Sequence, residues 1–125
     1  SLGYVKYLGK LIDRSKSLLD GKLMVSYSCL EDSKTFITTD KPSDSLYAML
    51  LAIKGVEVVL FFKEVNESTT EVGFRASHQS TVDVGELAGR FGGGGHKKAA
   101  GLTINEPLSS IEKTLVTSVE ALLKA

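Results

Sequence analysis

The chain has 125 residues, of which 42% are hydrophobic and 24% charged, as in a single soluble globular domain. Fifteen basic side chains balance fifteen acidic ones, so the net charge is zero. These values disfavour a disordered chain and a protein held to duplex DNA mainly by bulk positive charge. The single cysteine, Cys29, disfavours a disulfide scaffold. We expect it to be a small apolar strand residue in a reducing compartment, which favours a cytoplasmic protein.

No segment has the pattern of a membrane span or a signal peptide. The longest uncharged apolar run, residues 46–53, is much shorter than the about 20 residues that a membrane-spanning helix needs, so we expect no membrane contact. The chain begins at Ser1 rather than at a methionine, and we therefore expect it to be part of a longer protein.

The first half of the chain predicts two helices that flank a strand and a loop. Residues 2–19 carry apolar side chains at helical spacing, and Gly21 is placed for a left-handed C-terminal cap. Residues 22–29 alternate apolar and polar side chains, which predicts a strand. Polar residues 31–40 predict a loop, and residues 43–53 predict a short helix.

The next segment predicts a β-hairpin. Residues 56–62 are almost continuously apolar and β-branched, as in a central strand covered on both faces. A polar turn at residues 66–69 separates them from residues 71–77, which alternate.

The last third predicts two capped helices around a glycine run. Asp83 and Glu86 form a D-x-x-E capping pattern before one helix, and Ser109 and Glu112 form a second pattern before the closing helix. Residues 102–104 are a short strand candidate. The predicted order is α-β-α-β-β-α-β-α, in an α+β fold with a mixed β-sheet and helices packed against it.

Residues 92–101, GGGGHKKAAG, form the most unusual stretch. Glycines without Cβ atoms let the backbone take positive φ angles and let a ligand approach the N–H groups, which in a turn can bind an anion. His96 can donate a hydrogen bond or carry a charge, and Arg90, Lys97 and Lys98 add local positive potential. These features predict a phosphate site, while the alternative is a flexible loop tip with solvated lysines. Neither the Walker A spacing nor a dinucleotide fingerprint is present.

Arg75 and Ser77 form a second candidate site. Spaced by two on a strand, they share one face of the sheet. Arginine can bind a phosphate through two parallel hydrogen bonds, and serine can donate one more. The alternative is an arginine on a solvated sheet face, and His78 is expected to be a surface residue.

The sequence shows no parts for cleaving a phosphate bond. Two histidines lie 18 residues apart, and there is no H-x-x-H, D-x-D or cysteine-pair motif. We therefore predict no catalytic residue, no metal ligand and no cofactor in this chain.

The stretch DVGELAGRFGGGGHKKAAG, preceded by EVGFRAS and by IKGVEVVLFFKE, resembles the DHHA1 domain. This is the C-terminal domain of DHH phosphoesterases, which include RecJ-like exonucleases and nanoRNase/phosphoadenosine-phosphate phosphatases. The resemblance covers residues 21–125 as a substrate-binding domain, with residues 1–20 as a linker-like N-terminal helix.

The resemblance implies a two-domain, manganese-dependent enzyme. An N-terminal DHH domain of the same protein would hold two Mn²⁺ ions, whose bound water attacks phosphorus. The DHHA1 domain would bind a single-stranded oligonucleotide or a nucleotide. The matching substrate-contacting positions are Arg75, Ser77, Gly93, Gly94, Gly95 and His96, with Arg90, Lys97 and Lys98 as electrostatic support. The full-length protein would be a phosphodiesterase or phosphatase, and it could form a homodimer.

Two other functions compete with this interpretation. One is a non-catalytic nucleic-acid-binding module like the appendage of alanyl-tRNA synthetases, which the neutral net charge and the lack of a basic stripe disfavour. The other is a structural or oligomerisation domain whose glycines only form a tight turn.

Overall fold

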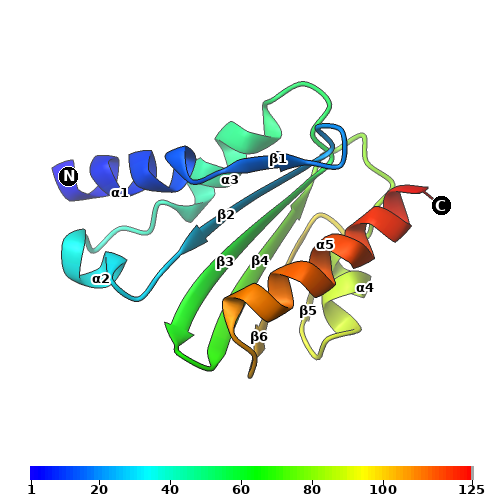
Figure 1. Ribbon diagram of the computed structural model, residues 1–125. Helices are drawn as coiled ribbons and strands as arrows, with labels where there is room; N and C mark the ends of the chain where they lie inside the picture. Colours follow the sequence, from blue (N-terminus) through cyan, green and yellow to red (C-terminus); the bar gives the residue numbers. More distant parts are fainter. Residues whose placement is uncertain (125) are drawn as a thin grey trace.

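The computed structural model describes residues 1–124 as one mixed sheet with helices on both faces (Figure 1). The strands are β1 (Lys16–Leu18), β2 (Leu23–Ser28), β3 (Val58–Asn66), β4 (Thr69–Ala76), β5 (Gly94–Gly95) and β6 (Ala99–Ile104). The helices are α1 (Leu2–Asp13), α2 (Asp32–Thr35), α3 (Ser43–Leu51), α4 (Val84–Gly89) and α5 (Leu108–Lys124). The strand order is β1-β2-β3-β4-β6-β5, with β2 and β3 parallel and every other pair antiparallel. The predicted α+β fold with a mixed sheet is therefore confirmed.

Two hydrophobic cores lie on opposite faces of the sheet. On one face, Leu60, Phe62 and Phe74 pack in a buried cluster with residues of α4 and α5. On the other face, Val59 and Phe61 pack in a second cluster with residues of α1 and α3. Figure 1 shows α5 crossing the first face while α1 and α3 run along the second. The first five residues of β3 are all buried, as the apolar run predicts for a strand covered on both faces.

Several predicted elements are confirmed at nearly their predicted positions. The β3–β4 hairpin pairs antiparallel, with Phe61 opposite Gly73. Asp83 caps α4, because its Oδ1 accepts a hydrogen bond from the Glu86 N–H at 3.0 Å. Within the described residues 1–124, no helix combines the length and the apolar character needed to cross a membrane.

The predicted helix over residues 2–19 is wrong in its last part. The helix α1 ends at Asp13, and residues 16–18 form the edge strand β1 against β2. The connection to β2 is a tight turn in which Leu19, Asp20 and Gly21 all have positive φ angles. Gly21 therefore has the predicted left-handed conformation, but in a strand connection rather than a helix cap.

Four further predictions need correction. The polar segment 31–40 contains the short helix α2, and the glycine run contributes the two-residue strand β5. The strand predicted at residues 102–104 begins earlier, at Ala99. Ser109 is the second residue of α5 and so does not precede the helix as the capping pattern predicted.

A nearly buried ion pair holds α2 against the end of α1 and β2. Both terminal guanidinium nitrogens of Arg14, Nη1 and Nη2, donate to the Asp32 carboxylate, at 2.6 and 2.8 Å, and Nη1 also donates to the Tyr27 carbonyl at 3.0 Å. The carboxylate accepts two more hydrogen bonds, from the Cys29 N–H and the Ser28 hydroxyl. Cys29 itself is half-buried and lies one residue beyond β2, rather than within the strand as expected.

We expect Asp32→Ala to lower the free energy of unfolding by about 3 kcal/mol, because it leaves the poorly exposed Arg14 charge without its partner. Burial alone would raise the pKa of Asp32, but the hydrogen bonds from Arg14, Cys29 and Ser28 lower it to about 2. This stabilisation is present above the ordinary carboxyl pKa of about 4 and is lost as the pH falls through 2. Urea unfolding at neutral and acid pH measures both effects.

The control for this variant is Arg90→Ala, which breaks the exposed Arg90–Glu86 pair of α4 and should cost about 0.5 kcal/mol or less. Equal losses in the two variants would contradict a structural role for the Arg14–Asp32 pair.

Candidate functional site

The predicted site residues Arg75 and His96 lie in one row across the sheet. Arg75 on β4 is opposite Ala99 on β6. Ala99 exchanges two backbone hydrogen bonds with His96, at 2.7 and 3.3 Å, across the two-residue turn of Lys97 and Lys98. The backbones of Arg75 and His96 are thus two strand spacings, or roughly 10 Å, apart. The His96 side chain is exposed to solvent.

The glycine loop is packed against α4. The Val84 N–H donates to the Lys97 carbonyl at 3.0 Å. A Cβ atom on Gly85 would lie only 2.8 Å from the carbonyl oxygens of Gly95 and His96, so the helix can approach the loop only through this glycine. The segment before His96 is therefore an ordered edge of the sheet and not a flexible tip.

The glycines of the loop differ in how much space surrounds the position of a Cβ atom. A Cβ atom on Gly93 would overlap the Gly101 carbonyl oxygen and the Leu102 side chain, and one on Gly95 would lie 2.6 Å from the Ala100 Cα. Gly95 also has a φ of +147°. Gly94, in contrast, faces open space with no atom within 4 Å of a Cβ. Close packing therefore requires a glycine at positions 93 and 95, while position 94 has room for a side chain.

Gly93→Ala should destabilise the protein by about 1–3 kcal/mol, because the added methyl group has no space. Gly94→Ala, at the neighbouring position in open space, should change the unfolding free energy by no more than about 0.5 kcal/mol. Thermal or urea unfolding of the two variants checks this difference. Similar stabilities would contradict the packing of Gly93 on β6.

Arg75 rests on the ring of Tyr47, a residue that the sequence analysis did not single out. The guanidinium carbon lies 4.3 Å from the ring centroid, within range of a cation–π contact. One guanidinium nitrogen donates to the Phe74 carbonyl at 3.0 Å, and another lies 3.9 Å from the exposed carboxylate of Asp44. The Arg75 side chain remains 31% exposed. The guanidinium thus packs on the Tyr47 ring and remains partly exposed to solvent.

Tyr47 is itself fixed by its surroundings. Its ring packs edge-on against Phe61, with ring centroids 6.3 Å apart. Its hydroxyl occupies the space in which a Cβ atom on Gly73 would lie. Burial raises the pKa of Tyr47 to about 12, although the nearby Arg75 charge acts in the opposite direction. The signal that could have revealed Tyr47 is Gly73, a glycine inside a strand on the same face as Arg75.

The tyrosine absorbance should show a step near pH 12, and Tyr47→Phe should remove it. Because the Arg75 charge lowers the pKa of Tyr47, Arg75→Ala should move this step to higher pH. An ultraviolet titration at 295 nm measures both effects. A step that Arg75→Ala does not move would contradict the contact between the guanidinium and the ring.

The remaining predicted residues have different surroundings. Lys98 donates to the carbonyls of Ser77 and Ser80, at 2.9 and 2.6 Å, so its charge braces the segment after β4. Arg90 pairs with Glu86 at 2.8 Å. Lys97 is exposed and has no ion-pair partner among residues 1–124.

Ser77 lies just beyond the end of β4 and is half-buried. Its N–H donates to the Glu57 carbonyl at 2.8 Å. His78 is exposed, as expected for a surface residue. Ser77 therefore belongs to the segment after β4 that Lys98 contacts, two residues beyond Arg75.

A groove of about 1110 Å³ opens beside Arg75 on the α1 and α3 face of the sheet. Arg75 and Gly93 line it, together with Tyr47, Phe61 and Gly101. The other predicted positions do not line it: Ser77, Gly94, Gly95 and His96. Arg75 is therefore the residue that connects the row containing His96 with the groove.

The described part of the chain has no group of three or more histidine, cysteine, aspartate or glutamate side chains that could hold a metal ion. The arrangement can bind an anion through the side chains of Arg75 and His96.

Solved structures show where this fold occurs. An exopolyphosphatase-related protein from Bacteroides fragilis matches with a TM-score of 0.86 and 22% identity, covering 100% of this chain and 37% of that one. A pGpG-specific phosphodiesterase, PggH, from Vibrio cholerae matches with a TM-score of 0.66 and 18% identity, covering 96% and 40%. The C-Ala domain of Aquifex aeolicus alanyl-tRNA synthetase matches with a TM-score of 0.56 and 17% identity, covering 89% and 98%.

At these identities the three similarities establish the fold alone. The chain spans about two fifths of the length of the first two proteins. A search of curated protein sequences found no match. A family model for the DHHA1 domain, however, matches residues 10–125. The chain therefore belongs to the DHHA1 domain family.

Proposed function

We propose that this chain is the substrate-binding domain of a DHH phosphoesterase that acts on short oligonucleotides or nucleoside bisphosphates. The observation that carries the proposal is the position of Arg75, whose guanidinium is held on the Tyr47 ring with its outer side open. The exposed His96 lies in the same row of the sheet. Membership of the DHHA1 family and the fold shared with a pGpG-specific phosphodiesterase support this assignment.

In this proposal, the chain binds and orients the phosphate. The planar guanidinium of Arg75 can donate two parallel hydrogen bonds to phosphate oxygens. The exposed His96 imidazole can donate a third hydrogen bond. To do so, the Arg75 side chain must move away from Asp44. This movement costs little free energy, because the two charged groups are 3.9 Å apart and the Asp44 side chain is 95% exposed.

The manganese ions that the DHH resemblance implies do not fit this chain. No suitable group of acidic, histidine or cysteine side chains occurs among residues 1–124. The proposal therefore assigns metal binding and hydrolysis to a separate DHH domain of the same protein. It gives this chain no step in the cleavage reaction.

Binding of the 5′-phosphorylated dinucleotide pApA, measured by calorimetry or NMR titration, tests the phosphate site. We expect Arg75→Ala and His96→Ala each to weaken binding about tenfold or more, because each removes a charge-assisted hydrogen bond. Lys113→Ala removes an exposed charge from α5, on the opposite face of the sheet, and should leave the affinity unchanged. Equal affinities for all three variants would contradict the proposed site.

A nucleic-acid-binding module without catalysis is the second candidate. The observation in its favour is that the chain covers 98% of the C-Ala domain, a separately solved piece of alanyl-tRNA synthetase. A tRNA competitor in the same titration separates the two functions. The phosphoesterase proposal expects tRNA to compete no better than a short oligonucleotide, whereas preferential binding of tRNA would favour the alternative.

A further inference from the structure

The turn that carries His96 is tied to the rest of the domain by the side chain of Lys98. Residues 96–99 form a two-residue β-hairpin turn between β5 and β6. The ammonium group of Lys98 donates to the Ser77 carbonyl at 2.9 Å and to the Ser80 carbonyl at 2.6 Å. A side chain of the turn therefore reaches back to the segment that follows the strand of the candidate site, β4.

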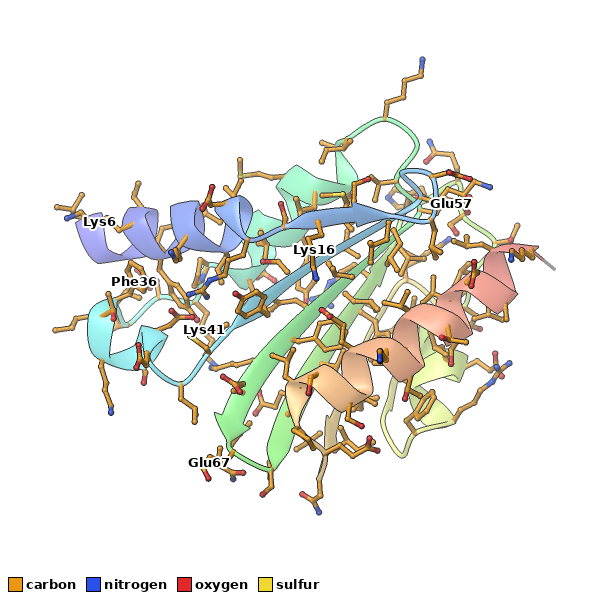
Figure 2. All side chains as sticks on the ribbon, in the orientation of Figure 1. Lys6, Lys16, Phe36, Lys41, Glu57 and Glu67 are labelled. Carbon is orange, nitrogen blue, oxygen red and sulfur yellow. The ribbon has the colours of Figure 1, made fainter. Side chains whose placement is uncertain are left out.

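The two carbonyls that Lys98 contacts belong to a turn that is itself fixed. The Ser80 N–H donates to the Ser77 carbonyl at 3.1 Å, which closes residues 77–80 into a turn. The Ser77 N–H donates to the Glu57 carbonyl, and the Ser80 hydroxyl donates to the Glu57 carboxylate, both at 2.8 Å. Glu57, labelled in Figure 2, lies just before β3. Lys98 is therefore anchored on a part of the chain that is attached to the sheet.

The two lysines of the His96 turn have different surroundings. Lys98 is half-buried, and backbone carbonyls take two of the three N–H donors of its ammonium group. Lys97 is exposed and has no ion-pair partner among residues 1–124. Lys98 would have to give up its hydrogen bonds to contact a phosphate, whereas Lys97 would not. Any effect of Lys98 on a ligand is therefore expected to pass through the residues that it holds.

The main chain at Lys98 connects the turn to the strand of Arg75. The Ala76 N–H donates to the Lys98 carbonyl at 3.0 Å, one position beyond the Arg75–Ala99 pair of β4 and β6. On the other side of the turn, β5 consists of two glycines and has no side chain that could fix it by packing. The ammonium group of Lys98 thus adds a side-chain contact to the backbone hydrogen bonds that place His96 relative to Arg75.

We propose that Lys98 is a positioning residue for the phosphate site. Its ammonium group holds the His96 turn against the segment after β4, and it supports binding through His96 and not by contact with the phosphate. The inference rests on the proposed function and goes beyond it. It gives Lys98 a geometric role in place of the electrostatic support suggested by the sequence, and it leaves that support to Lys97.

The first test follows the wild-type chain by NMR during a titration with pApA. Because the hydrogen bonds to Ser77 and Ser80 persist in the proposed complex, the Nζ signal of Lys98 should stay in place while the ring signals of His96 shift. A Lys98 signal that moves as far as those of His96 would show that the ammonium group contacts the ligand, and would overturn the proposal. This measurement needs no variant to fold.

The second test is a double-mutant cycle with pApA. Lys98→Met removes the ammonium group and keeps an unbranched stem, and it should weaken binding about threefold or more. In a His96→Ala background the same change should cause no further loss, because the group that Lys98 positions is absent. Lys97→Met is the matched control: it removes the same charge from an exposed side chain, and its effect should be equal in both backgrounds.

The outcomes separate the positioning role from the phosphate site. If Lys98→Met weakens binding equally with and without His96, or leaves the wild-type affinity unchanged, the positioning role is wrong while the phosphate site stands. If Lys98→Met acts only when His96 is present, the proposal holds. If His96→Ala and Arg75→Ala both bind pApA like the wild type, the phosphate site fails and the positioning role fails with it.

Discussion

The candidate site depends on the way in which one buried tyrosine fills a gap left by a glycine. Tyr47 extends from α3 onto the sheet, and its hydroxyl takes the place of a side chain at Gly73. Phe61 holds the edge of the ring, and Arg75 lies over its face. A larger residue at position 73 would displace the ring and with it the guanidinium. The position of the cation is therefore set by packing between a helix and two strands, and not by the weak ion pair with the exposed Asp44.

The same face of the sheet has a second fixed point at its other side. The Arg14–Asp32 pair anchors α2 next to β2, and the connection to α3 then forms the outer wall of the groove. One wall is thus held by buried, charge-assisted hydrogen bonds and the other by aromatic packing. Arg75 lies where the groove meets the row that leads to His96. Arg75 and His96 are consequently held by the same sheet.

The sequence predicted the elements whose side-chain pattern is long and regular. The buried β3, the β3–β4 hairpin and the cap at Asp83 were predicted because periodicity and capping chemistry are local. The strand β1 was missed because it has three residues, and Leu18 and Leu19 continue the helical spacing of α1. The strand β5 was missed because two glycines carry no side-chain pattern.

The candidate site was predicted unevenly for similar reasons. The motif containing Gly93 to His96 is contiguous, and Arg75 and Ser77 share one strand, so sequence reasoning could find them. Tyr47 comes from a helix 28 positions before Arg75, and only the fold brings the two together. The groove could not be predicted, because its outer wall is a polar connection without periodicity whose position depends on long-range contacts.

The shortness of the two outermost strands affects how the domain can meet other proteins. β1 has three residues and β5 has two, so neither outermost strand offers an extended peptide a long row of backbone groups. Long, flat margins recruit strands from other molecules, and proteins that aggregate or swap segments commonly do so there. The two outermost strands are therefore poor templates for sheet extension, and contacts with a neighbouring domain are expected to use side-chain surfaces instead.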